Sequence, residues 1–253
     1  MTAHEDVQNQ IAELSRQIVK TPQNAELHLR RGELHRIRRN WDAALADYKA
    51  AEKLNPELTA VTLCRGKLHL DSGQPDKAIQ MLDRFLRLQP DHPEALVSRG
   101  RALILLGQNA EAAIDFSRAV AIDPQPEYYI ERAQALASEC RTEEALSGLD
   151  EGIERLGSLV TLQLLAIELE RSRKNYDSAL TRLDTIIAQA ERKEKWLAQQ
   201  GEIQEQAGLI NEALESYRRA LSAIQALPPR LKTNAATIEL KKKLLAKTNQ
   251  REE

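Results

Sequence analysis

The sequence predicts an all-α solenoid, a stack of repeated helix pairs, and three observations carry this prediction. Aromatic residues make up only 4% of the 253 residues and charged residues 29%, a balance that suits helical repeats better than a β-sandwich or barrel. Proline closes the first three periods of the chain, at Pro56, Pro90 and Pro124. Alanine recurs in steps of 33 or 34 residues, at Ala44, Ala78, Ala112, Ala145, Ala179 and Ala213. A period of this length is typical of stacked helix–turn–helix repeats.

Two further positions keep the same period. Twelve residues before each alanine, a small residue in five of the six periods lets the second helix of a pair approach the first. Four residues after each alanine, one helical turn on, a large apolar residue fills the space between repeats. The first position holds Gly32, Gly66, Gly100, Ala133, Ile167 and Gly201. The second holds Tyr48, Leu82, Phe116, Leu149, Leu183 and Tyr217.

This combination of period, small position, large position and closing proline resembles the tetratricopeptide repeat family. The resemblance implies a right-handed superhelix of six helix pairs, in the style of free-standing bacterial repeat proteins. The six repeats are expected at 25–58, 59–92, 93–125, 126–159, 160–193 and 194–227. The fifth departs most from the pattern, because Ile167 and Ile186 stand where small residues are expected.

A capping segment is predicted at each end of the array, where a terminal repeat would otherwise expose its core. Residues 1–24 contain a helix over Glu5–Lys20, with Val7, Ile11, Leu14 and Ile18 at helical spacing. In residues 228–253, Pro228-Pro229 breaks the chain before an amphipathic helix over Asn234–Lys247. The tail at 248–253 is expected to be disordered.

Charge and hydropathy exclude several classes of function. The net charge of −2 gives no field that would drive nucleic-acid or membrane binding, and no apolar run is long enough to span a bilayer. The start, MTAHEDVQNQ, lacks the basic and apolar regions of a secretory signal. Cys64 and Cys140 lie two repeats apart and are expected to be free thiols. We expect a soluble protein of the cytoplasm, or of the periplasm where a signal peptide has been removed.

The family resemblance implies that the first helices of the pairs line a concave groove. Two rows of residues fall at groove positions, one aliphatic and one charged. The aliphatic row is Leu29, Leu63, Val97, Ile130 and Leu164. The charged row is Glu33, Lys67, Arg101, Gln134, Glu168 and Glu202, basic in the middle and acidic at both ends. The other interpretation is that the aliphatic row packs inside the array and the charges are solvated.

The predicted function is a protein–protein interaction scaffold, adaptor or assembly factor that binds a peptide or a partner helix in this groove. Lys67 and Arg101 would hold a carboxylate of the partner, and the aliphatic row would take its apolar side chains. Some family members clamp the C-terminal carboxylate of a chaperone with a fixed set of Lys, Asn and Arg. That clamp is not expected here, because only Arg101 fits it. Leu29, Glu33, Cys64 and Val97 stand at four of its other places.

The alternative function is single-stranded RNA binding through the arginine-rich first repeat. Arg30, Arg31, Arg36, Arg38 and Arg39 form this basic patch. RNA binding would require stacked aromatic side chains beside the patch, and Trp41 is expected to pack between helices instead. Arginine also recurs at one repeat position, Arg31, Arg65, Arg99 and Arg132, which indicates a structural or partner-facing ladder.

Catalysis and metal binding have no support in the sequence. No nucleophile elbow, zinc-protease helix, glycine-rich phosphate loop or CxxC motif is present. His28, His35 and His69 fall on related helix positions, but no cysteine or carboxylate joins them with a recognised zinc spacing. We therefore expect no enzymatic activity, no cofactor and no metal.

Overall fold

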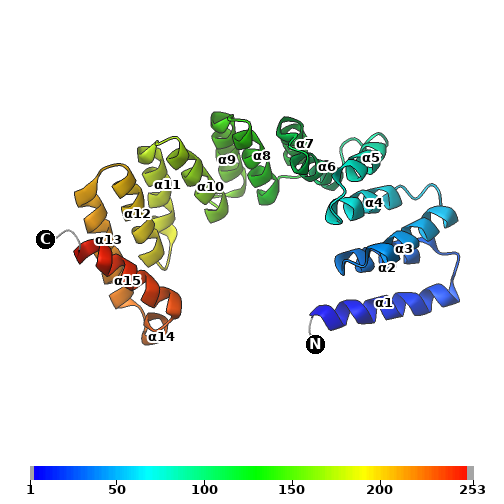
Figure 1. Ribbon diagram of the computed structural model, residues 1–253, viewed down its shortest axis with the longest axis horizontal. Helices are drawn as coiled ribbons and strands as arrows, with labels where there is room; N and C mark the ends of the chain where they lie inside the picture. The colour runs from blue at the N-terminus through cyan, green and yellow to red at the C-terminus, as the bar shows by residue number, and fades with distance from the viewer. Residues whose placement is uncertain (1–2, 250–253) are drawn as a thin grey trace. The chain divides into compact units, whose positions relative to one another are not determined.

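Every secondary-structure element between residues 3 and 249, the part of the chain that the computed structural model describes, is a helix (Figure 1). Side chains are described from residue 6 onward. The prediction of an all-α protein is confirmed. The chain forms two compact units, Met1–Arg141 (the N-terminal unit) and Thr142–Glu253 (the C-terminal unit). The division falls inside the repeat expected at 126–159, and the six-repeat boundaries stay a prediction.

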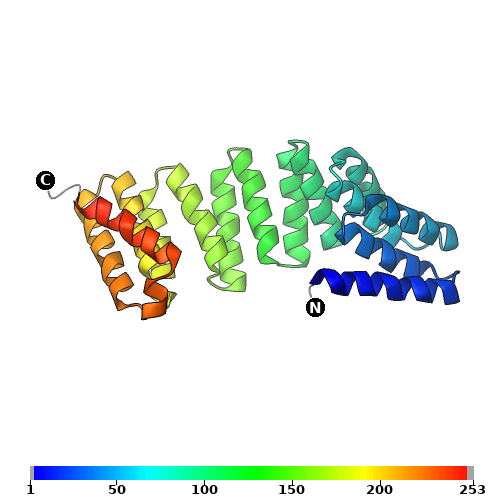
Figure 2. The ribbon, with the colours of Figure 1, turned by 60° about the horizontal axis from the view of Figure 1, so that its bottom comes forward.

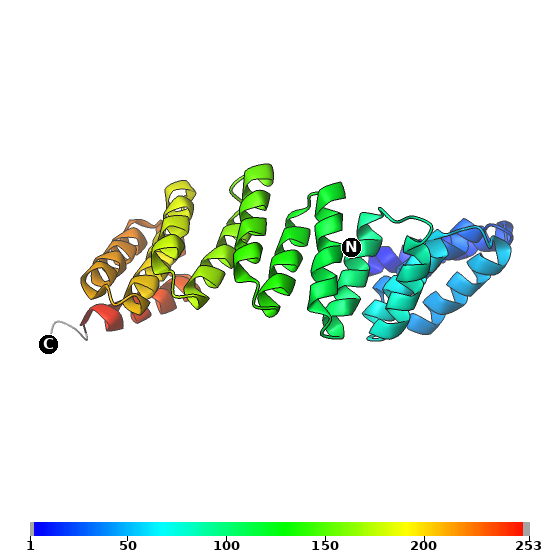
Figure 3. The ribbon, with the colours of Figure 1, turned by 90° about the horizontal axis from the view of Figure 1, so that it is seen from above.

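The N-terminal unit contains eight helices within the described residues. Helix α2 pairs with α3, α4 with α5 and α6 with α7. Figure 3 gives the view of the helices from above. The bounds are α1 Ala3–Lys20, α2 Ala25–Ile37, α3 Trp41–Leu54, α4 Ala60–Asp71, α5 Pro75–Leu86, α6 Pro93–Leu105, α7 Asn109–Ile122 and α8 Pro126–Ser138.

The C-terminal unit contains α9 to α15. Helix α10 pairs with α11 and α12 with α13, and α15 packs along α13 (Figure 2, red against orange). The helix predicted at 234–247 is α15, which begins one residue later and extends to Asn249. The disorder expected at 248–253 is therefore wrong for residues 248 and 249. Residues 250–253 lie outside the described part. The bounds are α9 Thr142–Leu156, α10 Val160–Ser172, α11 Tyr176–Gln189, α12 Glu194–Gln206, α13 Ile210–Ala226, α14 Pro229–Lys232 and α15 Ala235–Asn249.

Proline and polar caps set where the helices begin. Pro75, Pro93 and Pro126 occupy the first turn of α5, α6 and α8, where a missing N–H costs no hydrogen bond. The Asn24 side chain accepts a hydrogen bond from the Glu26 N–H at the start of α2. These residues start the helices at the spacing that the repeat requires.

The small and large repeat positions face each other in the pairs α2/α3, α4/α5, α6/α7 and α12/α13, where the small residue is glycine. A Cβ atom added at Gly100 would lie 2.8 Å from the Phe116 ring, and one at Gly66 would lie 2.8 Å from Leu82. Such distances are too short for unstrained contacts, so glycine is what allows these helices to approach. Ala112 is fully buried in the same interface. The predicted role of the small position is confirmed by this geometry.

Helix α1 follows the register of a second helix rather than that of an unrelated cap. Thr21-Pro22 closes it 34 residues before Asn55-Pro56, which closes α3. Ser15 accepts a hydrogen bond from Arg31 Nη1 at 3.0 Å, sixteen residues later. Asp83 accepts one from Arg99 over the same separation. Helix α1 therefore covers α2 as one second helix covers the next first helix.

Candidate functional site

A surface cavity of about 360 Å³ lies on the first helices of the N-terminal unit. Its walls come from α2, α4, α6 and α8, which bring residues from positions 36 to 128 to one place. We call it the N-terminal cavity. It is lined by Arg36, Lys67, Leu70, Asp71, Glu94, Val97, Ser98, Arg101 and Tyr128.

Most of the predicted aliphatic row packs inside the array. Leu29, Leu63 and Val97 are only 6%, 7% and 2% exposed. Of these three, Val97 alone lines the N-terminal cavity. Ile130 and Leu164 are half-buried, and Leu164 packs against the core of the C-terminal unit. The row therefore contributes mainly to packing between first helices, and little of it is open to a partner.

Lys67 is held between two carboxylates of its own chain. Its Nζ lies 2.6 Å from Glu94 Oε1 and 3.5 Å from Glu33 Oε2. Burial works to lower the pKa of Lys67, but the hydrogen bond to Glu94 and the charge of Glu33 outweigh it and raise the pKa. The amine is therefore a charged and already paired cation.

Glu33, the second carboxylate beside Lys67, is also bound by Arg36 and Tyr48. Both of its oxygens accept from Arg36, at 3.1 Å each, and Arg36 also forms an ion pair with Asp71. The Tyr48 hydroxyl donates to Glu33 as well. Burial works to raise the pKa of Glu33, but the hydrogen bonds from Arg36 and Tyr48 hold it below its usual value.

Arg101 is paired across to the next first helix. Its Nε and Nη2 donate to Glu131 Oε1 at 3.0 and 2.6 Å. The hydrogen bonds to Glu131 raise the pKa of Arg101. A smaller cavity of about 180 Å³ adjoins this pair, with Gln134 and Ile104 among its lining residues. Lys67 and Arg101, the two cations predicted to hold a partner's carboxylate, are thus both engaged by the chain's own glutamates.

The remaining predicted groove residues lie in the C-terminal unit. Glu202 accepts from Lys243 at 2.5 Å and so ties α12 to α15. Lys247 makes a parallel pair with Glu205 at 2.6 Å. Glu168 is exposed on α10. The structure thus groups Glu33, Lys67 and Arg101 around one network, whereas Glu202 serves to dock the last helix.

The recurring arginines are structural braces within the N-terminal unit. Arg31 donates twice to Asp47, at 2.9 and 2.7 Å, and Arg65 donates to Glu52 at 2.9 Å. Arg99 makes the same bidentate contact with Asp115, at 2.7 Å for both bonds. Arg132 lies 5.1 Å from the centre of the Tyr129 ring. In the arginine-rich patch, Arg30 is also paired with Glu26 and Arg36 with Glu33.

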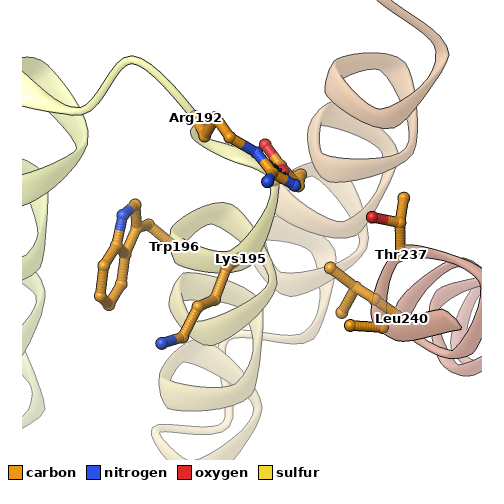
Figure 4. A pocket seen from close by; sticks show the side chains of 7 residues that line it. Arg192, Lys195, Trp196, Thr237 and Leu240 are labelled. Carbon is orange, nitrogen blue, oxygen red and sulfur yellow. Dashed lines mark hydrogen bonds and ion pairs between the residues drawn. The ribbon is translucent and has the colours of Figure 1, made fainter. Parts of the chain in front are cut away.

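A second cavity, of about 460 Å³, lies in the C-terminal unit between the start of α12 and α15 (Figure 4). Arg192 Nε donates to the buried Glu194 at 2.7 Å, and Lys195 Nζ lies 4.6 Å from the Trp196 ring centre. Thr237 and Leu240 form the wall on α15. Nothing in the repeat pattern indicated this cavity, because it depends on where α15 packs.

Asp71, Glu94, Tyr128 and Glu131 were not predicted from the sequence, and Arg36 was predicted only as part of an RNA-binding patch, although a signal for some of these contacts was present. Arg36 follows Glu33 by three residues, the spacing of a helical ion pair. Opposite charges also stand about one repeat apart, as at 36 and 71 or 101 and 131. Pairing charges between neighbouring first helices would have found these two contacts.

The described residues contain neither a metal-binding cluster nor a membrane-spanning helix. Among the residues with described side chains, no group of three or more His, Cys, Asp or Glu side chains could hold a metal ion. His28 instead contacts Asp47, at 3.3 Å, beside the Arg31 brace. From α1 to α15, no helix is long and apolar enough to cross a bilayer.

The sequence matches the tetratricopeptide repeat family over residues 9–58 and 65–127. The "FK506-binding protein-like" protein of Mus musculus is 32% identical over 103 residues, which are 41% of this chain and 29% of that protein. The chain thus matches about three tenths of the length of such curated relatives.

Solved structures share the fold at low sequence identity. The C-terminal part of a TPR repeat-containing protein from Cytophaga hutchinsonii superposes with a TM-score of 0.71 at 16% identity, covering 94% of this chain and 95% of that one. YrrB, described as a TPR protein with an unusual peptide-binding site, gives a TM-score of 0.56 at 22% identity, covering 69% and 91%. The predicted α-solenoid fold is thereby confirmed.

Proposed function

Because the chain is a tetratricopeptide repeat protein, we propose that it is a scaffold or assembly factor that binds a segment of another protein at the N-terminal cavity. The observation that carries the proposal is the cavity itself, to which four first helices contribute charged, aliphatic and aromatic side chains. Tyr128 and Leu70, both half-buried, offer apolar surface beside hydrogen-bonding groups. This mixture suits an extended peptide or the side of a helix.

One of the proteins with the same fold, YrrB, is described as having a peptide-binding site. At 22% identity that likeness concerns the fold, so the proposal here rests on the residues of the cavity. The alternative of RNA binding is less favoured, since Arg30, Arg31 and Arg36 are all paired with internal carboxylates. A guanidinium beside a carboxylate attracts a phosphate less strongly, because the carboxylate repels it.

Site-specific photo-crosslinking of the full chain in source-cell lysate tests the proposal. A photoreactive phenylalanine analogue replaces Tyr128 in the cavity and, in a matched control, Ile114, which is 62% exposed on α7 and does not line the cavity. We expect protein adducts from position 128 and few from 114. Adducts that form equally at 114, or only there, would place the partner on the second helices and contradict the proposal.

A further inference from the structure

Resting on the proposed function, we propose that the N-terminal cavity receives a cationic side chain, arginine or lysine, from the partner segment rather than a carboxylate. Four features of the cavity support this proposal: the exposure of its charged side chains, the way they are paired, the surroundings of Tyr128, and the apolar surface open to the stem of a long basic side chain. Together they reverse the sign of the partner charge predicted from Lys67 and Arg101 alone.

The exposed charges of the cavity are mainly carboxylates. The side chains of Asp71 and Glu94 are 39% and 51% exposed, whereas those of Arg36 and Lys67 are 14% and 19% exposed. An approaching segment therefore meets two carboxylates, Asp71 and Glu94, and one cation, Arg101, before the less exposed Arg36 and Lys67. A like-charged carboxylate would be repelled, and a cation would be attracted.

The pairing of these groups points the same way. Arg36 and Lys67 are paired with three carboxylates, Glu33, Asp71 and Glu94, which leaves one negative charge in excess, and Arg101 is paired separately with Glu131. Of these carboxylates, Asp71 and Glu94 line the cavity itself. Arg101 is the one cation that is substantially exposed, at 49%, and two of its nitrogens already donate to Glu131. A carboxylate from the partner would have to displace Glu94 to reach Lys67, and at Arg101 it would find only Nη1 unused by Glu131.

A partner cation displaces nothing. Each exposed carboxylate has an oxygen that accepts no hydrogen bond from the described residues, Oδ1 of Asp71 and Oε2 of Glu94, since their pairs use the other oxygen. A carboxylate oxygen can accept more than one hydrogen bond, so a second donor adds to the existing ion pair. The guanidinium of arginine, with its five donors, suits two such acceptors well.

Tyr128 adds an aromatic wall to the cavity. Burial is the main cause that raises the pKa of its hydroxyl, and the charges of Asp123, Glu94 and Glu131 add to it while Arg101 works against them. Burial disfavours any charge, whereas the nearby carboxylates disfavour an anion and favour a cation. An arginine or lysine placed over the ring would also gain a cation–π interaction.

The aliphatic side of the cavity suits the stem of a long basic residue. Leu70 and Val97 line the same cavity as Asp71 and Glu94. Lysine and arginine bury their methylene groups against such surface while the charged end reaches polar partners. The cavity of about 360 Å³ exceeds what one such side chain needs, so the flanking backbone of the segment also has room.

The test uses a phage-displayed library of random 12-residue peptides, panned against the intact chain. Selected peptides are then titrated against the wild type and against Asp71→Asn/Glu94→Gln. The matched control is Asp76→Asn/Glu111→Gln, which removes two exposed carboxylates outside the cavity. Circular dichroism establishes that each variant keeps its helicity.

We expect peptides with arginine or lysine at one fixed position. Their affinity should fall about tenfold or more in the cavity variant, as for the loss of one or two close charge pairs, and should change less than twofold in the control. Peptides that share a fixed aspartate or glutamate, and that lose binding in Lys67→Met/Arg101→Met, would overturn the inference while leaving the proposed function in place.

The proposed function fails separately. In Leu70→Trp, a half-buried cavity residue is enlarged to fill the space. Peptides that bind this variant as tightly as the wild type would lie elsewhere on the chain, whatever their charge. A library that yields no binding peptide would contradict both the proposed function and the inference that rests on it.

Discussion

The two units brace the same helix-pair pattern with different chemistry. In the N-terminal unit, Arg31 and Arg99 on first helices reach a carboxylate on their own second helix and a polar group on the preceding one. In the C-terminal unit the equivalent residue is Gln200, which donates to Asp184 at 2.7 Å and accepts from Ser216 at 3.3 Å. At this repeat position one unit thus uses the charged guanidinium of arginine, whereas the other uses the uncharged amide of Gln200.

This difference shows that the repeat fixes the packing of its small and large residues but not the polar groups that join its layers. Ala44, Ala112 and Ala213 are fully buried in both units. The polar position varies as long as each buried group finds a partner. In the fifth repeat Ala166 takes the position, and Arg182 reaches Asp150 directly, at 2.6 and 2.9 Å.

The largest expected effect comes from breaking a charged brace. Asp47→Ala leaves the Arg31 guanidinium, 23% exposed, with Ser15 as its remaining partner. Removing one member of a largely buried ion pair should cost about 3 kcal/mol of unfolding free energy. Ser216→Ala, at the same repeat position in the other unit, breaks neutral hydrogen bonds and should cost about 1 kcal/mol.

Hydrogen exchange of the intact chain measures the two variants separately, since a repeat array can open locally. Asp47→Ala should reduce protection in α2 and α3, and Ser216→Ala in α12 and α13. Equal losses in both variants would mean that the charged and neutral braces contribute alike.

The next effect concerns the small position. In Gly100→Ala, the new Cβ meets the Phe116 ring at 2.8 Å, and overpacking should destabilise the chain by about 2 kcal/mol. In the sequence of the fourth repeat, alanine at the small position, Ala133, goes together with leucine at the large position, Leu149. Gly100→Ala/Phe116→Leu should therefore recover part of the loss.

A double-mutant cycle in urea gives the coupling between the two substitutions. The single variant Phe116→Leu is the control, because it removes volume without adding a Cβ. Losses that simply add would show that residues 100 and 116 do not determine each other, against the geometry described above.

The interface of small and large residues was fully predictable from the sequence, because it depends on contacts within one helix pair. The contact between Gly100 and Phe116 is predicted by their separation of sixteen residues, which recurs between Gly66 and Leu82. Thr21-Pro22 also predicts that α1 has the register of a second helix, because it lies one repeat before Asn55-Pro56. The prediction of a capping helix did not include this register. The short helix α14 was not predicted, because Pro228-Pro229 indicated a break in the chain, whereas Pro229 in fact occupies the first turn of a helix.

The candidate site was only partly predictable. Periodicity placed Lys67 and Arg101 on the correct helices, but it could not say that both are already paired. One partner, Glu131, stands at a position where the other repeats have different residues, so the period gives no warning of it. Glutamate does recur at the position of the other partner, Glu94, as Glu26 and Glu127, but the period does not say which cation each one reaches. Pairing across first helices depends on side-chain reach between repeats, which spacing alone does not encode.

A smaller effect is expected at the turn between the two helices of a pair. Gly73, Gly107 and Gly208 adopt positive φ there, but the equivalent Arg39 and Lys174 do so at φ of 59° without being glycine. Relief of this left-handed strain by Lys174→Gly should stabilise the C-terminal unit by about 1 kcal/mol.

The reverse substitution, Gly208→Ala, should destabilise the same unit by a similar amount, since no neighbour crowds the site and only the backbone conformation matters. Thermal unfolding of both variants measures the pair. Arg39→Gly repeats the experiment in the N-terminal unit. A melting temperature that falls in Lys174→Gly would show that the lysine side chain compensates for the strain.

The smallest effect separates the two units by pH. The pKa of Glu33 is lowered in the folded chain, so its contribution to stability is present above the unfolded pKa of about 4.3 and is lost as the pH falls through the folded value. The difference in unfolding free energy between the wild type and Glu33→Gln should therefore be greatest near neutral pH and shrink in acid. Glu202→Gln is the counterpart in the C-terminal unit; its partner Lys243 is 58% exposed, so its effect should be smaller and should weaken with salt. If the difference in unfolding free energy from the wild type is the same for the two variants at every pH, the network around Glu33 stabilises the fold no more than an exposed ion pair does. The charges of the N-terminal cavity would then be held in place for a partner rather than for the fold.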